Sequence, residues 1–419
     1  MKLSHKLLPL LALVVSTQAY ATDGYFSHGY GVKSQGMGGV GIALPQDALA
    51  AASNPAGMGL IGDRVDFGLT WFRPERESEI SGNILPGVNN TFDANDSKNF
   101  FIPEFGYNRQ INPDVTLGVS VYGNGGMNTD YKSGIPLFGS TKSSGVDLAQ
   151  LIVAPTVTWK LSPAQTIGVS LNLAYQRFEA KGLQGFAGLS TSPDNLTDNG
   201  HDNSYGAGLH VGWIGLVNDI VTLGATYQSR TYMSKFDKYK GLFAEQGDFD
   251  IPSTYGIGIA AKATPALTLA ADIQRINYSD VDSVGNASLP NLTNGLGSDN
   301  GAGFGWRDVT AVKLGASYIY SENLTLRGGY NHANQPIRSR DTFFNILAPG
   351  VVEDHVTLGA TWVLANKAEL SFAYMHAFEN RVNGKSSIPP GFPPGGLGGG
   401  DTKLRMYQNS LGIAYGWKI

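Results

Sequence analysis

The chain has 419 residues and a formal net charge of −4, and Asp, Glu, Lys and Arg together make up only 15 % of it. This near-neutral composition excludes nucleic-acid binding, which requires basic patches, and the 42 % apolar fraction argues against disorder. Cysteine is absent, which excludes disulfides, thiolate nucleophiles and cysteine-based metal sites.

Residues 1–21 have the three parts of a secretory signal peptide. Lys2 and Lys6 precede an apolar run at 7–15, and Ala19 and Ala21 form an A-x-A-like cleavage site. A membrane-spanning helix needs about 20 apolar residues, and neither this run nor any later stretch of the sequence reaches that length. We therefore expect export, cleavage after Ala21 and no helical anchor.

Residues 22–63 lack the alternation of strands and are rich in small residues. Aromatic residues such as Tyr25 and Phe26 favour a hatch folded inside a barrel lumen over a disordered periplasmic tail. A G-x-G-x-x-G match at 36–41 does not follow a strand, so it does not predict a dinucleotide site.

Three residues lie near the end of this segment, shortly before the first strand. Asn54, Pro55 and Ala56 serve either as the pivot between the hatch and the barrel or as an ordinary turn. We assign them to the candidate gate and keep both interpretations open.

Residues 64–419 contain fourteen segments with the period of two that is typical of strands. The predicted strands are 64–73, 99–109, 115–124, 147–160, 165–177, 205–214, 220–231, 253–262, 266–277, 307–320, 322–332, 353–364, 367–379 and 404–419. Short and long connections alternate between them, whereas a soluble sandwich would not place a long loop at every second connection. The pattern predicts an all-β fold: a 14-stranded antiparallel transmembrane β-barrel in the outer membrane of a Gram-negative bacterium.

The third predicted strand contains an interruption at Gly123, Asn124 and Gly125. Glycine inside a strand weakens pairing and often marks a bulge. We therefore expect a kink in the barrel wall at this point.

The third and fourth long loops are rich in apolar residues. Exposed apolar clusters usually mark a binding surface, although the packing of one loop on another explains any single residue equally well. The candidate ligand-binding residues are Phe186, Leu189, Phe236, Leu242 and Phe243. Lys181, Arg307 and Lys313 are candidate partners for a charged ligand group, with pairing to barrel acids as the alternative.

Several short motifs occur in a characteristic order along the chain. They are Ser53-Asn-Pro-Ala56, Ile80-Ser-Gly-Asn83, Asn172-Leu-Ala-Tyr175, Gly185-Phe-Ala-Gly188, Gly305-Trp-Arg-Asp308 and Ala373-Tyr-Met-His376. Together with the strand count, they resemble the FadL family of outer-membrane long-chain fatty acid transporters.

This resemblance implies a monomeric barrel with a hatch in its lumen, surrounded by outer-membrane lipid and lipopolysaccharide and inserted by the barrel assembly machinery. The ligand would be a long-chain fatty acid or another hydrophobic small molecule. It would land on a groove between the third and fourth extracellular loops and reach a pocket bounded by the hatch. It would then leave sideways through the wall, at the kink of the third strand.

Two positions depart from the family pattern. Fatty-acid members carry basic residues there that hold the ligand carboxylate, but this chain has Gly185 at one position and Ala302 near the other. Neutral aromatic or aliphatic hydrocarbons are therefore an alternative substrate class, and a general diffusion porin is an alternative function.

We expect neither an enzyme nor a bound cofactor or metal. The histidines lie in no G-x-S-x-G or H-E-x-x-H context, which hydrolases and metalloproteases use to place a nucleophile or a zinc ion.

The alternating loop lengths predict the orientation of the barrel, with the short turns and the N-terminal segment in the periplasm. An epitope inserted after Gly391, in the last long loop, is expected to be labelled on intact cells. Antibody labelling before and after permeabilisation measures this. Labelling that requires permeabilisation would reverse the orientation.

Overall fold

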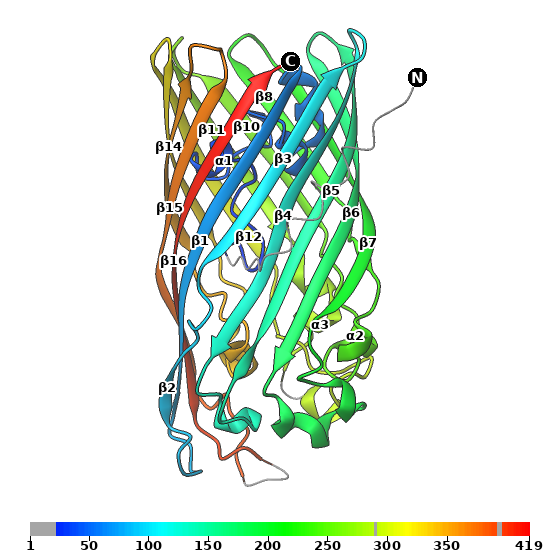
Figure 1. Cartoon of the computed structure of the whole chain (residues 1–419), viewed down its shortest axis with the longest axis vertical. Coiled ribbons are helices and arrows are strands. Elements are labelled where there is room, and N and C mark those ends of the chain that lie inside the picture. The colour runs from blue at the N-terminus through cyan, green and yellow to red at the C-terminus, as the bar shows by residue number, and fades with distance from the viewer. Residues whose placement is uncertain (1–21, 289–290, 392–395) are drawn as a thin grey trace, which may run out of the picture.

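Fourteen antiparallel strands close into a tall barrel in the computed structural model of the protein, which describes residues 22–288, 291–391 and 396–419 (Figure 1). The predicted signal peptide lies outside the described residues. Each strand pairs with its neighbours in the chain, and β1 pairs with β16 from Arg64 opposite Lys418 to Ser81 opposite Asp401, which closes the wall. The predicted 14-stranded antiparallel barrel is confirmed.

The wall strands have the following bounds. They are β1 (Arg64–Ser81), β3 (Phe100–Gln110), β4 (Val115–Tyr131), β5 (Ser144–Ser162), β6 (Gln165–Lys181), β7 (Asp202–Leu216), β8 (Val221–Gln228), β10 (Thr254–Lys262), β11 (Leu267–Ile276), β12 (Val309–Ser321), β13 (Leu324–Ala333), β14 (Asp354–Val363), β15 (Glu369–Gly384) and β16 (Asp401–Lys418). Two short strands lie outside this circle: β2 (Asn90–Asp93) pairs with β1, and β9 (Tyr232–Met233) pairs with β7.

The helical elements are all short. The α-helices are α1 (Val32–Gln35), α2 (Ala244–Gly247) and α3 (Asp282–Gly285). The 3₁₀ turns are Ala50–Ala52, Pro55–Leu60, Pro136–Phe138, Gln184–Leu189, Pro193–Asn195, Asp237–Tyr239, Tyr278–Asp280, Asn291–Asn294, Ser339–Asp341 and Phe344–Ile346. In the described part of the chain, no helix combines the length and hydropathy of a membrane span.

Several strands are longer than the sequence pattern predicts. The apolar alternation of β1 ends near Arg73, yet its ladder with β16 continues to Ser81. Beyond Arg73 the outward positions carry charges, and Glu77 and Glu79 pair with Arg405 and Lys403 on β16. Backbone pairing therefore continues past the point where the wall stops being apolar, and hydropathy alone misses this part.

The two faces of each strand differ in the way that a membrane barrel requires. On β16, Leu411, Ile413 and Tyr415 are exposed on the outer face, whereas Gly412 faces the interior beside Val32 and Gln35. Large aromatic residues, among them Trp159 and Trp362, are likewise exposed on the outside. This alternation suits a wall with lipid on one side and a packed lumen on the other.

The N-terminal segment lies inside the barrel, as the blue coil in the upper half of Figure 1 shows. Its backbone is bound by acids on the inner wall. Glu104 of β3 accepts hydrogen bonds from the amides of Gly31 and Val32, and Asp272 of β11 accepts them from Gly41 and Ile42. Carboxylates thus satisfy backbone donors that no strand partner reaches.

Glycine permits the closest approach between this segment and the wall. A Cβ on Gly329 of β13 would lie 2.2 Å from the backbone nitrogen of Gly38, which itself has a φ of +71°. Only glycine fits both sides of such a contact. The abundance of glycine therefore reflects packing of backbone against backbone.

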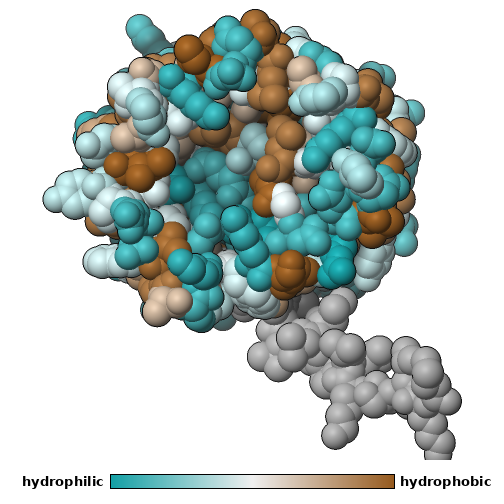
Figure 2. Space-filling view, turned by 90° about the horizontal axis from the view of Figure 1, so that it is seen from above, coloured by the Kyte–Doolittle hydropathy of each residue, from teal (hydrophilic) through white to brown (hydrophobic). Residues whose placement is uncertain are grey.

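An ion-pair network joins the segment to the wall near the end with the short turns. Lys33 of α1 contacts Glu369 of β15 at 2.5 Å, and Arg64 of β1 contacts the same carboxylate at 2.8 Å and Asp66 at 2.7 Å. Figure 2, which looks onto this end, shows hydrophilic residues around a recess at its centre. Removing one partner would leave a buried charge uncompensated, so this network anchors the segment.

Deleting residues 22–56 tests whether this segment blocks the lumen. The deletion is expected to raise the ion conductance of the barrel sharply, because the segment fills space that water would otherwise occupy. Single-channel recording in planar bilayers measures the conductance, and heat-modifiable migration on gels shows whether the barrel has assembled. Equal conductance with and without the segment would contradict a blocking role.

Candidate functional site

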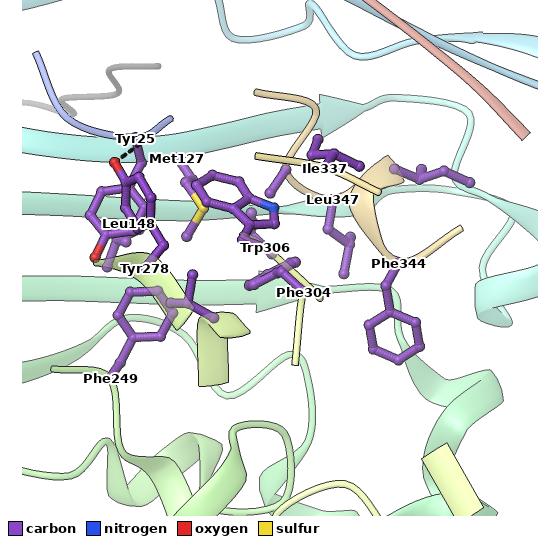
Figure 3. Close-up of a cluster of buried hydrophobic side chains, with 14 of the residues drawn as sticks. Tyr25, Met127, Leu148, Phe249, Tyr278, Phe304, Trp306, Ile337, Phe344 and Leu347 are labelled. Carbon is purple, nitrogen blue, oxygen red and sulfur yellow. Dashed lines mark hydrogen bonds between the residues drawn. The ribbon is translucent and has the colours of Figure 1, made fainter. Parts of the chain in front are cut away.

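An aromatic cluster fills the part of the lumen nearest the long loops (Figure 3). The ring of Tyr278 lies 4.9 Å from that of Tyr25 and 5.2 Å from that of Trp306. The Tyr278 hydroxyl donates to the carbonyl of Asp23 and accepts from the amide of Tyr25. The cluster therefore joins the N-terminal segment to the loops that follow β11.

Two apolar cavities lie within this cluster. The larger, of about 20 Å³, is lined by Val146, Phe178, Leu242, Phe243, Ser283, Ala302, Gly303, Phe304, Phe344 and Leu347. The smaller, of about 10 Å³, is lined by Phe138, Leu183, Phe186, Leu242, Leu296, Phe344 and Leu347. An engineered apolar cavity that binds benzene has a volume of about 150 Å³, far larger than either of these. Side chains must therefore move before a ligand fits.

The loop between β13 and β14 forms one side of both cavities, and hydrogen bonds from β4 hold this loop in place. Thr129 and Tyr131 of β4 donate hydrogen bonds to the carbonyls of Leu347 and Ile346. Asn345 then accepts a hydrogen bond from the indole of Trp306 and donates one to the carbonyl of Phe304. These contacts place Phe344 and Leu347 against the residues that line the larger cavity.

The loop residues predicted to bind ligand are buried in this structure, which corrects the expectation that they form an exposed apolar surface. Phe186, Leu242 and Phe243 line the cavities. Phe236 is fully buried and packs on Phe243 at 6.1 Å between ring centroids, whereas Leu189 is half-buried against the cluster. The loops fold inward because their apolar side chains find partners in one another and in the lumen.

Among the described residues, none of the three predicted cations lines the two cavities. Lys181 pairs with Glu179 at 3.2 Å and lines a polar cleft that shares Val146 with the larger cavity. Arg307 is exposed and donates to the carbonyl of Gln335. Lys313 is buried beneath the N-terminal segment, where it donates to the carbonyl of His28. Among the described residues, those that line the two cavities carry no charge.

Lys313 belongs to a small polar cluster with His28 and Asp23. The Lys313 ammonium lies 3.4 Å from the Asp23 carboxylate. Burial, together with His355 of β14, lowers the pKa of His28 to about 4, so its imidazole is neutral at periplasmic pH. The cluster thus binds the N-terminal segment to β12.

The predicted kink in β4 is a β-bulge. Gly123 pairs with Leu151 and Gly125 pairs with Gln150, so Asn124 has no opposite residue on β5. Beyond Val121, β4 also separates from β3, whose ladder with β4 covers only Phe105–Gln110. A break in wall pairing therefore lies next to the bulge, beside residues 100–104 of β3.

The N-terminal segment covers this break from the inside. The amide of Gly126 donates to the carbonyl of Tyr25 at 3.0 Å, and the amide of Ser27 donates to the carbonyl of Asn124 at 3.2 Å. The Asn124 side chain donates to Gln150 and accepts from Tyr30. The part of the β4 edge at Asn124 and Gly126 is thus paired with the N-terminal segment.

The second group of candidate gate residues, Asn54, Pro55 and Ala56, lies in the N-terminal segment and is bound to the inner wall. The Asn54 carboxamide is fully buried, donates to the carbonyls of Ile42 and Trp213, and accepts from the amide of Ala56. Pro55 follows as the first residue of a 3₁₀ turn. Asn54 therefore acts as a helix cap, and its role as a pivot stays a prediction.

Sequence reasoning missed several residues of the cluster. Tyr278, Phe304, Trp306 and Phe344 come from the loops after β11 and β13, whereas the prediction concentrated on the third and fourth loops. The apolar run at 343–348 was a usable signal for the last of these loops. Metal binding has no support: the described residues contain no group of three or more His, Cys, Asp or Glu placed to hold an ion.

These features define a class of protein: a membrane-spanning β-barrel whose lumen is filled by its own N-terminal segment and capped by apolar loops. The family model for outer membrane protein transport proteins (OMPP1/FadL/TodX) matches residues 12–392. The chain belongs to this family of outer-membrane transport proteins.

Individual relatives are distant. The long-chain fatty acid transport protein of Escherichia coli O157:H7 is 21 % identical over 425 aligned positions, which cover 90 % of this chain and 92 % of that protein. An uncharacterized protein of Chlorobium limicola is 36 % identical over 76 residues, which span 17 % of this chain and 37 % of that protein.

Solved structures share the fold at low sequence identity. The Pseudomonas putida toluene transporter TodX has a TM-score of 0.68 at 19 % identity, with 94 % of this chain and 99 % of that chain covered. A Pseudomonas aeruginosa FadL homologue has a TM-score of 0.71 at 15 % identity, with the same coverage. These likenesses support the barrel architecture.

Gly125→Ala tests the contact between the hatch and β4. A Cβ at Gly125 would lie 2.0 Å from the Tyr25 carbonyl oxygen, so the N-terminal segment must leave the β4 edge. Losing two backbone hydrogen bonds costs about 2 kcal/mol of hatch docking. Protease cleavage within residues 22–30 is therefore expected to accelerate.

Gly328→Ala is the matched control, because the nearest atom to its Cβ lies 3.8 Å away on the outer face. It is expected to leave the cleavage rate unchanged. Equal protection of the two variants would show that the segment does not depend on the β4 edge.

Proposed function

We propose that the protein is a passive transporter that takes up long-chain fatty acids or other hydrophobic compounds through the outer membrane, and that it selects them by burial of apolar surface. Membership of the outer-membrane transport family supports the class of activity. The names of the relatives supply both substrate types, since one is a long-chain fatty acid transport protein and another is a toluene transporter.

The observation that carries the proposal is the chemistry of the two cavities. Their walls are formed by aromatic and aliphatic side chains from the loops and from β5 and β6. Burying each CH₂ group is worth about 0.8 kcal/mol, so a ten-carbon chain gains on the order of 8 kcal/mol before the costs of association. Such a lining suits a ligand without charge.

The three candidate cations already have protein partners, so the proposal does not require any of them to bind the carboxylate of a ligand. Lys181 and Lys313 are engaged by Glu179 and by the N-terminal segment, and Arg307 points to a loop carbonyl. A free acid would therefore keep its head group in water near the loops. Neutral aromatic and aliphatic hydrocarbons are thus substrates alongside fatty acids.

For the route, we propose admission between the loops, passage through the aromatic cluster and lateral exit at the break between β3 and β4. The hatch, residues 22–63, would release its hydrogen bonds to the β4 edge to open that exit. Hydrogen bonds to Ile42 and Trp213 fix Asn54 in place. The part of the hatch that moves would therefore be the part that precedes Asn54. The barrel itself, residues 64–419, would stay closed.

We further propose that the protein works as a monomer surrounded by outer-membrane lipid and lipopolysaccharide, after insertion by the barrel assembly machinery. It would carry out transport without catalysis. An esterase assay on the purified protein is expected to give no turnover.

A long-chain fatty acid and its methyl ester separate the two modes of recognition. Because burial of the chain dominates, the acid and the ester are expected to bind within about tenfold of each other, which is roughly 1.4 kcal/mol. Isothermal titration of palmitic acid and methyl palmitate against the detergent-solubilised protein measures both affinities.

The other outcomes identify the alternatives. A preference for the free acid far beyond tenfold would mean that a cation such as Lys313 or Arg307 holds the head group. Binding of neither ligand, together with a large ion conductance, would favour a general diffusion porin.

A further inference from the structure

The loop between β9 and β10 contains a strained turn. Glu245 has φ and ψ of 54° and 36°, and Gln246 has 55° and 51°, so two successive residues with a Cβ adopt the left-handed region. Gly247 follows with a φ of 98°. Left-handed backbone is disfavoured for residues other than glycine and persists only where surrounding contacts impose it.

Within its own loop, the turn accepts hydrogen bonds from Lys235 at the Glu245 carbonyl and the Gln246 side chain. Its other contacts come from the loop between β11 and β12. The amides of Glu245 and Gln246 donate to the carbonyls of Ser298 and Gly297 at 3.1 and 3.0 Å. The Gln246 carboxamide donates to the Gly297 carbonyl at 3.1 Å and to the Asp299 carboxylate at 2.7 Å. These hydrogen bonds therefore join two loops that are far apart in sequence.

These two loops form the lid of the apolar cavities. Leu242, which lines both cavities, and Phe243 lie directly before the turn. Leu296 precedes the acceptors of the hydrogen bonds, and Ala302 and Phe304 follow them. Separating the loops at the turn would thus move lining residues on both sides of the cavities apart.

We propose that the Glu245–Gln246 turn is a strained latch that sets the rate at which hydrophobic ligands reach the cavities. In the closed state, hydrogen bonds to Gly297, Ser298 and Asp299 hold the turn in its left-handed form. When the loops part, these bonds are lost but the backbone strain is released, which offsets part of the cost of opening. This inference rests on the proposed uptake of hydrophobic ligands through the loops.

Two substitutions are expected to change the rate of ligand access in opposite directions. Glu245→Gly removes the strain at that residue and keeps the amide bond to Ser298, so it stabilises the closed state and is expected to slow ligand access about tenfold. Gln246→Ala keeps the strain and removes the three hydrogen bonds of the Gln246 side chain, two of which cross to Gly297 and Asp299, so it is expected to speed access about tenfold. A role confined to structural stability would not give opposite signs.

Lys367→Gly is the matched control. Lys367 also has a left-handed φ, of 65°, but it lies in the short turn between β14 and β15 at the opposite end of the barrel. The same relief of strain there is expected to leave the rate unchanged. Thermal unfolding of each variant shows that the barrel is intact.

The rate is measured by stopped-flow quenching of Trp306 with the methyl ester of 9,10-dibromostearic acid, using the full chain in detergent. Trp306 is buried beside Phe304, which lines the larger cavity, at 6.3 Å between ring centroids. Subtracting the trace of the same protein with Trp306→Phe removes the signal of the tryptophans on the outer wall.

Slower quenching in Glu245→Gly, faster quenching in Gln246→Ala and an unchanged rate in Lys367→Gly would support the latch. Wild-type rates in both loop variants, or shifts in the same direction, would overturn it while leaving the proposed uptake intact. If the wild-type protein shows no quenching of Trp306 at all, the proposed function fails and the latch with it.

Discussion

A strand edge inside a membrane must have its backbone groups paired, and much of this structure follows from how one edge meets that requirement. β4 separates from β3 beyond Val121, close to the bulge at Asn124, and part of its edge is left without a wall partner. The chain resolves this internally, because Tyr25 and Ser27 of the N-terminal segment pair with Gly126 and Asn124, and Ala94 and Asp96 pair with Asp130. One local interruption in a strand thereby joins the wall to the N-terminal segment, at the place where we propose that the wall opens.

The long loops meet a second requirement, which is to bury their apolar side chains when no ligand is bound. Exposed apolar patches invite aggregation, and here the aromatic residues of five long loops pack on one another and on the N-terminal segment. The cavities that remain are too small for a ligand. Under the proposed function, binding would replace protein–protein contacts with protein–ligand contacts, so the loops would act as part of the gate as well as of the site.

The fold was largely predictable because a barrel repeats a local rule. Each strand must alternate apolar and small residues, and each second connection must be short, so fourteen strands emerge from the pattern alone. Strand ends were less predictable, as on β1, where charged residues continue the ladder beyond the lipid. The kink was predictable from Gly123 and Gly125 because glycine acts locally. That the hatch would pair with the kinked strand was not, because Tyr25 and Gly126 are far apart in the chain.

The candidate site was likewise only partly predictable from the sequence. The sequence by itself predicted an export signal, which lies outside the described residues, and its residue types and spacing determined the barrel and the apolar character of the loops. The absence of basic residues at Gly185 and near Ala302 was inferred from the resemblance to the FadL family. Only the tertiary structure decided that Lys181 pairs with Glu179, that Lys313 lies under the hatch and that Trp306 and Phe344 complete the cluster. The physical reason is that contacts between loops depend on long-range packing, which no local period encodes.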